Sequence, residues 1–322
     1  MKRPRRLRKN AAIRDLVANN FLSKNKFIYP LFVYKGQDNS RAIDAMPGIS
    51  QWSIDGVVLE VAEAYKLGIR HFLVFGSDTT KDEHAHSATL HAGPVPTALR
   101  RLRAEFNNDI VLYTDVCLCA YTTTGHCGLG AHGHIDNDSS LGVLAKMALT
   151  HAEAGADFVA PSDMMDGRVA AIRSLLDEQG FSETGIMSYS VKYASSYYGP
   201  FREAAGSAPQ HGDRKSYQMD IRNSHEALVE SKLDEDEGAD ILMVKPALAF
   251  LDIIQLVKSN TDLPLACYNV SGEYSMVKAA AQRGWVDEAN VVLENFYAFH
   301  RAGADIIISY HIKEALAKGW IQ

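Results

Sequence analysis

A lysine at the carboxyl end of a buried strand is the first residue in this sequence that indicates chemistry. Residues 241–244 are all apolar, which is typical of a parallel strand covered on both faces. Lys245 follows them, and Pro246 ends the strand because proline has no N–H to donate. Burial disfavours the ammonium form, so Lys245 is a candidate amine nucleophile. The alternative is a lysine whose side chain extends along the strand end to reach water.

A second lysine, Lys192, lies just beyond another expected strand, over residues 185–190. When two lysines share one pocket, each cation favours the neutral form of the other. Two free amines could form two Schiff bases with carbonyl compounds. The pair therefore indicates a site for two carbonyl substrates.

Three of the four cysteines, Cys117, Cys119 and Cys127, fall within eleven residues. In an extended segment, Cys117 and Cys119 point to the same side, and glycines at 125 and 128 let the loop return Cys127 to them. Three thiolates suit zinc and leave a fourth position open, as catalytic zinc requires. His126 is a further candidate ligand, and three reduced structural cysteines are the alternative. The fourth cysteine, Cys267, lies in an apolar strand and is expected in the core.

Other polar side chains come at or directly after expected strands. They are Asp115, Ser162, Asp163, Tyr189, Ser271 and Tyr310. Acids, hydroxyls, thiols and two lysines at one rim are typical of an active site and not of a structural surface.

A long segment at about 192–223 is rich in Gly, Ser and Pro, and a loop of this length is usually functional. We expect it to be a lid. It contains Phe201, Arg202, Arg214, Lys215 and Gln218. Its arginines could bind carboxylates through paired hydrogen bonds, although a solvated charged loop is the alternative for each arginine taken singly.

Eight apolar runs that alternate with helical patterns must position these residues. The expected strands are 27–33, 71–76, 109–116, 157–161, 185–190, the 238–246 stretch, 263–270 and 305–311. The expected helices are 11–20, 54–67, 95–106, 141–153, 168–178, 224–237, 248–260, 274–283 and 287–301, with a last helix after residue 311. Ser224 is the expected N-cap of its helix.

A Gly-Ala-Asp phrase recurs at 155–157, 238–240 and 303–305, each time between a helix and a buried strand. The glycine supplies the left-handed residue that ends a helix. Strands and helices in alternation, with this repeated joint, predict an α/β fold of the (β/α)8 TIM-barrel type. A doubly wound open sheet is the alternative, but no Gly-rich phosphate-binding fingerprint follows the first strand.

The composition is that of an ordinary globular protein, with 322 residues, 47% hydrophobic and 22% charged. No apolar run is long enough to span a bilayer, and no apolar stretch follows the basic N-terminus as in a signal peptide. We therefore expect a cytoplasmic protein with no membrane partner, in which the cysteines stay reduced.

The net charge of −6 is unevenly distributed, because the first fourteen residues hold seven Lys and Arg side chains and no acid. We expect a basic arm over residues 1–20 and one catalytic barrel domain over 21–322. A basic arm can bind nucleic acid, or it can contact the acidic surface of a neighbouring copy. Since no nucleic-acid motif accompanies the arm, we favour the second interpretation.

The sequence resembles the porphobilinogen synthase family, also called 5-aminolevulinate dehydratase, over nearly its whole length. The motifs that carry the resemblance are Arg3-Pro-Arg-Arg-Leu-Arg8, Asp115-Val-Cys-Leu-Cys119, Ala160-Pro-Ser-Asp-Met-Met-Asp-Gly167, Lys192-Tyr-Ala-Ser-Ser-Tyr-Tyr-Gly-Pro-Phe-Arg202, Met243-Val-Lys-Pro246 and Val270-Ser-Gly-Glu-Tyr274. The resemblance implies a TIM barrel that condenses two 5-aminolevulinate molecules into porphobilinogen with loss of two waters, in tetrapyrrole (heme) biosynthesis.

The resemblance also implies residue roles. Lys245 would hold the first substrate as a Schiff base, and Ser271 and Tyr310 would bind its carboxylate. Lys192 would engage the second substrate, with Arg202 and Arg214 at that carboxylate. Ser162, Phe201 and Gln218 are further substrate-binding candidates, and Asp115 is a candidate proton shuttle.

The resemblance implies metals and an assembly as well. Cys117, Cys119 and Cys127 match the ligands of the zinc-dependent branch, and Glu230 falls where many bacterial members bind an allosteric magnesium. The arm is similar to one that wraps a neighbouring subunit in a homo-octamer. Two departures concern the metal loop: Thr124 stands where the family commonly has His, and His132 and His134 are additional candidate ligands. The sequence after Tyr310 also diverges.

Two rival functions remain at this point. A Schiff-base aldolase on the same fold needs one reactive lysine and no zinc, so it would tolerate loss of Lys192. A nucleic-acid-binding protein would use the basic arm, with strongly salt-dependent binding that is lost when residues 1–14 are deleted.

Overall fold

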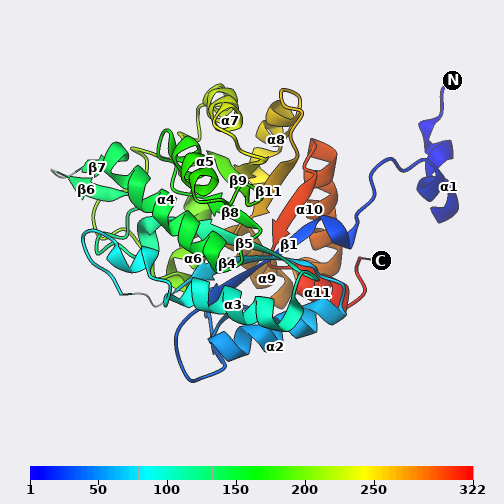
Figure 1. Cartoon of the computed structure of the whole chain (residues 1–322). Helices are drawn as coiled ribbons and strands as arrows, with labels where there is room; N and C mark the ends of the chain where they lie inside the picture. Colours follow the sequence, from blue (N-terminus) through cyan, green and yellow to red (C-terminus); the bar gives the residue numbers. More distant parts are fainter. Residues whose placement is uncertain (78–79, 132–133, 322) are drawn as a thin grey trace.

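The computed structural model of the chain describes residues 1–77, 80–131 and 134–321. Within them, eight parallel strands form a closed barrel in which each strand pairs with the next and β12 pairs with β1 (Figure 1). The barrel strands are β1 (Phe27–Val33), β4 (His71–Gly76), β5 (Val111–Val116), β8 (Phe158–Pro161), β9 (Gly185–Lys192), β10 (Ile241–Lys245), β11 (Leu265–Asn269) and β12 (Ile306–Ser309). The predicted (β/α)8 barrel and its eight strands are therefore confirmed.

Helices surround the barrel and cover its outer face (Figure 1). They are α2 (Ile54–Lys66), α3 (Pro94–Phe106), α4 (Asn137–Glu153), α5 (Arg168–Glu178), α7 (Glu226–Asp236), α8 (Leu251–Lys258), α9 (Ser271–Gln282), α10 (Glu288–Ala302) and α11 (Ile312–Ala317). Short 3-10 turns are η1 (Pro4–Arg8), η2 (Lys24–Lys26), η3 (His86–Thr89), η4 (Leu118–Ala120), η5 (Ser196–Tyr198) and η6 (Leu248–Phe250).

Four short strands and one helix were not predicted from the sequence. The first pair, β2 (Ser40–Ala42) and β3 (Ser50–Trp52), is antiparallel and extends the sheet beside β1. The second pair, β6 (Leu129–Ala131) and β7 (His134–Asp136), is also antiparallel and follows the cysteine loop. The helix α6 (Gly199–Ala204) lies inside the predicted lid segment. Strands of three residues carry too little alternation to be recognised in a sequence.

Some predicted helix ends were wrong. Ser224 does not cap α7, because the helix begins two residues later and the Asn223 side chain accepts a hydrogen bond from Glu226 N at 3.2 Å. The predicted helix at 248–260 is a 3-10 turn followed by the shorter α8. The helix expected at 11–20 ends at Leu16. Helix ends depend on local side-chain contacts that periodicity does not report.

The three repeated Gly-Ala-Asp joints have one geometry. Gly155, Gly238 and Gly303 have φ angles of 103°, 102° and 114°, in the left-handed region that ends a helix. Each returns the chain from an outer helix to a barrel strand. The predicted role of these glycines is confirmed.

Two apolar layers hold the barrel together. The outer layer, between strands and helices, consists mainly of aliphatic side chains such as Val61, Leu99 and Ile172. The layer inside the barrel is rich in aromatic rings, among them Phe32, Tyr189 and Tyr268. The barrel interior is thus filled, and its aromatic side chains form the floor beneath the strand ends.

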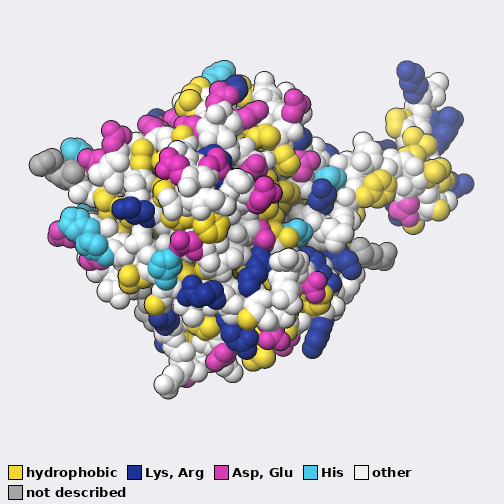
Figure 2. Space-filling model, viewed as in Figure 1, with side chains coloured by type: hydrophobic (Ala, Val, Ile, Leu, Met, Phe, Trp, Pro, Cys, Tyr) yellow, Lys and Arg dark blue, Asp and Glu magenta, His cyan; other side chains and the backbone are white. Residues whose placement is uncertain are grey.

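The N-terminal arm stands clear of the barrel (Figures 1 and 2). It contains η1 and α1 (Ala11–Leu16), and neither has a buried residue. Its apolar side chains Leu7, Leu16 and Val17 are exposed together with its arginines. In the described part of the chain, no helix combines the length and the apolar character that a membrane span needs.

Candidate active site

The two lysines face each other across neighbouring strands. Lys192 is the last residue of β9 and Lys245 the last residue of β10, and the two are partners in the parallel register. Each is only 5% exposed. Because both strands end at the same rim, the fold places two buried amines at one mouth of the barrel.

Aromatic rings enclose the amine of Lys245. Its Nζ lies 4.2 Å from the ring centre of Tyr268, 4.9 Å from Tyr189, 5.2 Å from Phe201 and 5.4 Å from Tyr198. We call these four rings the aromatic cage. Tyr189 and Tyr268 come from barrel strands, whereas Tyr198 and Phe201 come from the lid segment.

The cage excludes water from Lys245, and this burial is the main reason that the pKa of Lys245 is lowered. Burial, reinforced by the charge of Lys192, lowers the pKa of Lys245 to about 7, although Asp115 opposes the shift. A large fraction of Lys245 is therefore a free amine near neutral pH. The alternative that Lys245 reaches solvent is wrong, since its side chain is buried.

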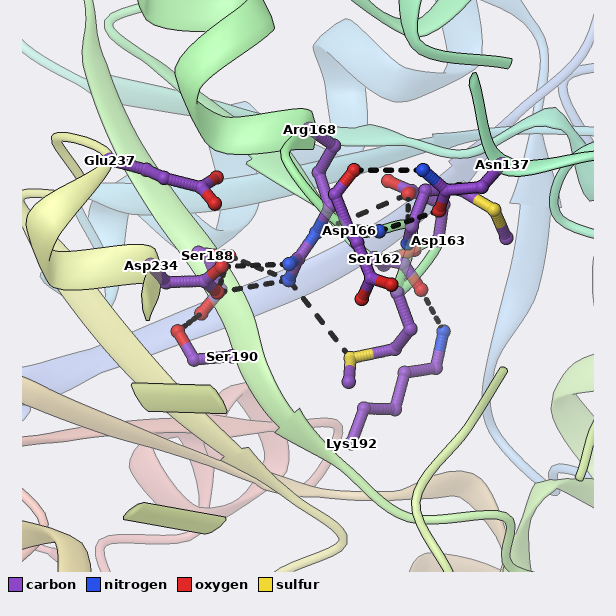
Figure 3. Close-up of polar contacts among 12 residues, drawn as sticks. Asn137, Ser162, Asp163, Asp166, Arg168, Ser188, Ser190, Lys192, Asp234 and Glu237 are labelled. Carbon is purple, nitrogen blue, oxygen red and sulfur yellow. Dashed lines mark hydrogen bonds and ion pairs between the residues drawn. The ribbon is translucent and has the colours of Figure 1, made fainter. Parts of the chain in front are cut away.

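Lys192 has a different environment. Its Nζ donates a hydrogen bond to the carbonyl oxygen of Ser162, in the loop after β8 (Figure 3). It lies 5.6 Å from the ring centre of Tyr189, so this ring borders both lysines. Tyr189 has a buried hydroxyl without a hydrogen-bond partner among the described residues.

Asp115, the candidate proton shuttle, lies near the end of β5. Burial raises its pKa, whereas Lys192, a hydrogen bond from Ser162 and Lys245 oppose the rise. Its Oδ1 has no hydrogen-bond partner in the described part of the molecule. A buried carboxylate oxygen without a partner is unusual and is available to a bound ligand.

The three clustered cysteines lie together as their spacing predicts. Their sulfur atoms are all within 4.8 Å of one another, and the Cys117 and Cys119 sulfurs are 3.3 Å apart. All three side chains are buried. Hydrogen bonds from Cys117 and Cys119, with the charge of Arg214, lower the pKa of Cys127 against the effect of burial.

The donor set of this cluster fits a thiophilic metal. It offers three sulfurs and, among the described residues, no carboxylate or imidazole within the same group. Three thiolates match zinc better than magnesium, which prefers oxygen. The two ring nitrogens of His126 instead lie 2.9 Å from the Tyr217 hydroxyl and 3.0 Å from the His211 carbonyl oxygen. His126 is therefore held outside the cluster, and the Thr124 hydroxyl accepts a hydrogen bond from the His126 backbone N–H at 3.3 Å.

The lid segment brings two arginines and a glutamine to the site. Arg214 is buried and donates hydrogen bonds to the carbonyl oxygens of Gly125 (2.9 Å) and Ser207 (2.6 Å). It thereby ties the lid to the cysteine loop. Arg202 and Arg214 each keep a buried Nε without a partner, and both polar atoms of the Gln218 side chain are unpartnered among the described residues.

Unpartnered buried donors of this kind cost free energy unless a ligand engages them, by about 1–3 kcal/mol each. The side of the site that the lid segment forms therefore offers unpartnered polar atoms to an acidic or polar ligand. Lys215 is not part of it, because its side chain is exposed and faces Asp213 at 3.5 Å.

Ser271 and Tyr310 lie on the side of Lys245. The Ser271 hydroxyl accepts a hydrogen bond from the backbone N–H of Phe201 at 3.0 Å, which links the lid to the start of α9. The Tyr310 hydroxyl lies 3.0 Å from that of Tyr268, whose ring belongs to the aromatic cage. Cys267 is buried inside β11, in the core as predicted.

Glu230 lies outside this centre, on α7. It lines an outer cavity of about 1280 Å³ that also borders on Gln218, His126 and His134. Burial raises the pKa of Glu230 to about 7, opposed by Arg168 and reinforced by Asp234. His132 lies outside the described residues.

One buried network near Lys192 was missed by sequence reasoning (Figure 3). Arg168, at the start of α5, is 2% exposed and makes two hydrogen bonds to Asp234, at 2.7 and 2.9 Å. Ser188 donates to the same carboxylate at 2.6 Å. Asp163 lies 4.0 Å from Arg168, and burial raises its pKa to about 7. The network joins α5, α7 and β9 to Asp163, which directly follows Ser162 in the loop after β8.

Comparisons with known proteins agree over the whole chain. The family model described as delta-aminolevulinic acid dehydratase matches residues 1–318. A relative of that name from Synechococcus elongatus is 53% identical over 317 residues, which is 97% of each chain. A relative of the same name from Methanothermobacter thermautotrophicus is 53% identical over 318 residues, 98% of this chain and 96% of the relative.

A solved structure extends the similarity to three dimensions. The delta-aminolevulinic acid dehydratase (porphobilinogen synthase) of Toxoplasma gondii, in complex with the reaction product porphobilinogen, superposes with a TM-score of 0.96. The two chains are 46% identical, and the match covers 99% of this chain and 91% of the other.

Proposed function

The chain belongs to the delta-aminolevulinic acid dehydratase family, and from this premise we propose how its own residues carry out the reaction. The enzyme is a hydro-lyase that condenses two 5-aminolevulinate molecules into porphobilinogen with loss of two waters. The observation that carries the proposal is the pair of buried lysines at adjacent strand ends, one of them inside an aromatic cage.

We propose that Lys245 binds the first 5-aminolevulinate covalently. The free amine attacks the ketone carbon, a carbon–nitrogen bond forms, and the ketone oxygen leaves as water after it has gained two protons. The resulting iminium is a cation, and the ring of Tyr268 at 4.2 Å from Nζ is placed to stabilise it. The iminium makes the adjacent carbon acidic, which prepares it for bond formation.

Ser271 and Tyr310 would bind the carboxylate of this first substrate. Both carry hydroxyl donors, and both are linked to the cage, Ser271 through Phe201 and Tyr310 through Tyr268. Hydrogen bonds to a carboxylate are about twice as strong as neutral ones, so two hydroxyls suffice to orient the molecule.

We assign the second 5-aminolevulinate to the side of Lys192 and the lid. Its ketone would meet Lys192, and its carboxylate would meet Arg202 and Arg214, whose free Nε atoms support this role. Phe201 and Gln218 would line the same space. Asp115 and Ser162 lie beside Lys192 and are the proposed groups for moving a proton at its amine.

We propose that Cys117, Cys119 and Cys127 hold a catalytic zinc ion. A zinc ion with three thiolate ligands would keep one open position that can polarise an oxygen of the second substrate. The thiols, the buried setting and the nearby Arg214 support the assignment. Glu230, at the outer cavity, is the proposed ligand of an allosteric magnesium, since a carboxylate suits this ion.

The pH dependence of the reaction is expected to follow the Lys245 amine. Below pH 7 the amine is protonated and cannot attack, so kcat/KM should rise with pH through a value of about 7. The measurement is a series of initial rates of porphobilinogen formation at constant ionic strength. A kcat/KM that continues to rise toward about 10.4, the value of an ordinary lysine, would contradict the assignment.

We further propose that residues 1–20 are an assembly arm on a single catalytic unit of residues 21–322, within a cytoplasmic homo-octamer. The arm has exposed apolar side chains beside its arginines and stands away from its own barrel (Figure 2). A segment with this character requires a second surface to cover it.

Deleting residues 1–20 is expected to reduce the assembly to smaller oligomers and to lower activity. Light scattering coupled to size-exclusion chromatography measures the first effect. A full-length variant with Arg3, Arg5, Arg6 and Arg8 changed to glutamine separates the contribution of charge from that of apolar contact. If the deletion left the assembly unchanged and instead removed salt-dependent nucleic-acid binding, the rival role of the arm would be favoured.

The proposed function has a direct test in the purified chain. Porphobilinogen formed from 5-aminolevulinate is measured, with 5-aminolevulinate-free controls. Product at a rate that scales with enzyme concentration is expected. Absence of product at every metal concentration, with aldol cleavage or condensation of another carbonyl compound in its place, would favour a Schiff-base aldolase.

A further inference from the structure

The carboxylate of Glu273 is a buried acceptor that joins the loops after β10 and β11 at the barrel mouth. Glu273 is the third residue of α9 and is 1% exposed. One oxygen accepts the backbone N–H of Leu248 at 2.7 Å. The other accepts the side-chain N–H of Asn269 and the backbone N–H of Val270, both at 3.0 Å.

The two backbone donors lie close in the chain to residues proposed to bind the first substrate. Leu248 comes three residues after Lys245, and Val270 directly precedes Ser271. One carboxylate therefore sets the position of the loop after β10 relative to the loop after β11. The amine and the first carboxylate-binding hydroxyl depend on the same anchor.

Asn269 connects the Glu273 carboxylate to the end of a third strand, β12. The Asn269 side-chain oxygen accepts a hydrogen bond from the Ser309 hydroxyl at 2.9 Å. The Ser309 hydroxyl in turn accepts the backbone N–H of His311 at 3.2 Å. Ser309 and His311 flank Tyr310, so the second carboxylate-binding hydroxyl belongs to the same network.

Burial raises the pKa of the Glu273 carboxyl to about 7, and the hydrogen bonds that it accepts from Asn269, Leu248, Val270 and Ala247 oppose the rise. Among the described residues, no lysine or arginine forms an ion pair with it. Burying an unpaired carboxylate is costly, and here only neutral N–H donors offset that cost. A glutamine would fill the same volume, but its NH2 group would face an N–H donor. The site therefore requires an acceptor on both oxygens.

We propose that Glu273 is a positioning residue that fixes Lys245, Ser271 and Tyr310 relative to one another. The inference rests on the proposed function, since it assumes that these three groups bind the first substrate. Glu273 does not touch the substrate. It acts through Leu248, Val270 and Asn269, and a shift of about 1 Å in such groups can lower a rate by about 100-fold.

The test compares Glu273→Gln with a matched control, Glu60→Gln. Glu60 is also a buried glutamate, 3% exposed, but it lies on α2 and accepts hydrogen bonds from Tyr29 (2.8 Å) and Lys313 (2.6 Å), which are not partners of Glu273. Four quantities are measured for each variant: the melting temperature, kcat, KM, and the rate at which borohydride traps 5-aminolevulinate on Lys245.

We expect Glu273→Gln to slow trapping at Lys245 by tenfold or more and to raise KM, at a temperature where the variant is folded. Glu60→Gln is expected to lower the melting temperature at least as much, with trapping unchanged. Equal trapping and kinetics in Glu273→Gln and the wild type would overturn the inference. If the wild type itself showed no adduct at Lys245, the proposed function of that lysine would fail instead.

If Glu273→Gln does not fold, Ser309→Ala gives the decisive result. This variant removes only the link from Asn269 to the backbone beside Tyr310. A rise in KM of several-fold with an unchanged melting temperature supports positioning through the network. Unchanged KM and trapping in a folded Ser309→Ala variant would contradict it.

Discussion

Replacing Lys245 with alanine is expected to lower porphobilinogen formation by on the order of 10⁴-fold or more, because it removes the amine that forms the first covalent intermediate. None of the four residues of the aromatic cage has an amine that could replace it. They are Tyr189, Tyr198, Phe201 and Tyr268. The measurement is the initial rate of product formation at saturating 5-aminolevulinate.

Two further variants are needed to interpret this result. Lys258→Ala is the matched control, because Lys258 pairs with Asp305 at 2.8 Å, near the opposite end of the barrel strands, and should retain wild-type turnover. Lys192→Ala should nearly abolish product, whereas a one-lysine aldolase would keep much of its activity. Wild-type rates in Lys245→Ala would contradict the assignment of the nucleophile.

Changing Cys127 to alanine is expected to remove the bound metal and to lower activity by on the order of 10³-fold, since two thiolates are too few for a zinc site. The three sulfurs lie within 4.8 Å of one another, so each contributes to one site. Metal content by mass spectrometry and the rate of product formation are measured on the same preparation.

The controls for this prediction use the fourth cysteine and the choice of metal. Cys267→Ala should keep both metal and activity, because Cys267 lies in the core of β11. A chelator should inactivate the wild-type enzyme, and zinc but not magnesium should restore it. Full activity of metal-free enzyme, or equal loss in Cys267→Ala, would contradict a catalytic role of the cluster.

The strands and the residues at their ends could be predicted from the sequence because both depend on local patterns. The apolar run of β10 ends in Lys245, and Asp115 lies one residue before the end of β5. Lys192 lies two residues beyond the strand expected at 185–190 and is the last residue of β9. The short spacing of the cysteines likewise limits where their sulfurs can lie. The motifs shared with the family added the reaction, which the residue pattern alone left open between a dehydratase and an aldolase.

The environment of these residues could not be predicted, because it is made by segments far apart in the chain. Tyr198 and Phe201 of the lid complete the cage around Lys245, and only the folded lid brings them there. Arg168 and Asp234 are 66 residues apart, and nothing local indicates that they pair. In the sequence, Glu273 looks like an ordinary glutamate in the first turn of a helix. Only the structure shows that Leu248, Asn269 and Val270 all donate hydrogen bonds to it.

The most direct test of the account is to trap the first covalent intermediate. Enzyme is mixed with isotopically labelled 5-aminolevulinate, reduced with borohydride, digested, and the labelled peptides are identified by mass spectrometry. We predict an adduct on Lys245 in the wild type that forms before any adduct on Lys192 and is absent from Lys245→Ala. An enzyme that makes porphobilinogen but carries its first adduct on another residue, or no adduct at all, would contradict the account.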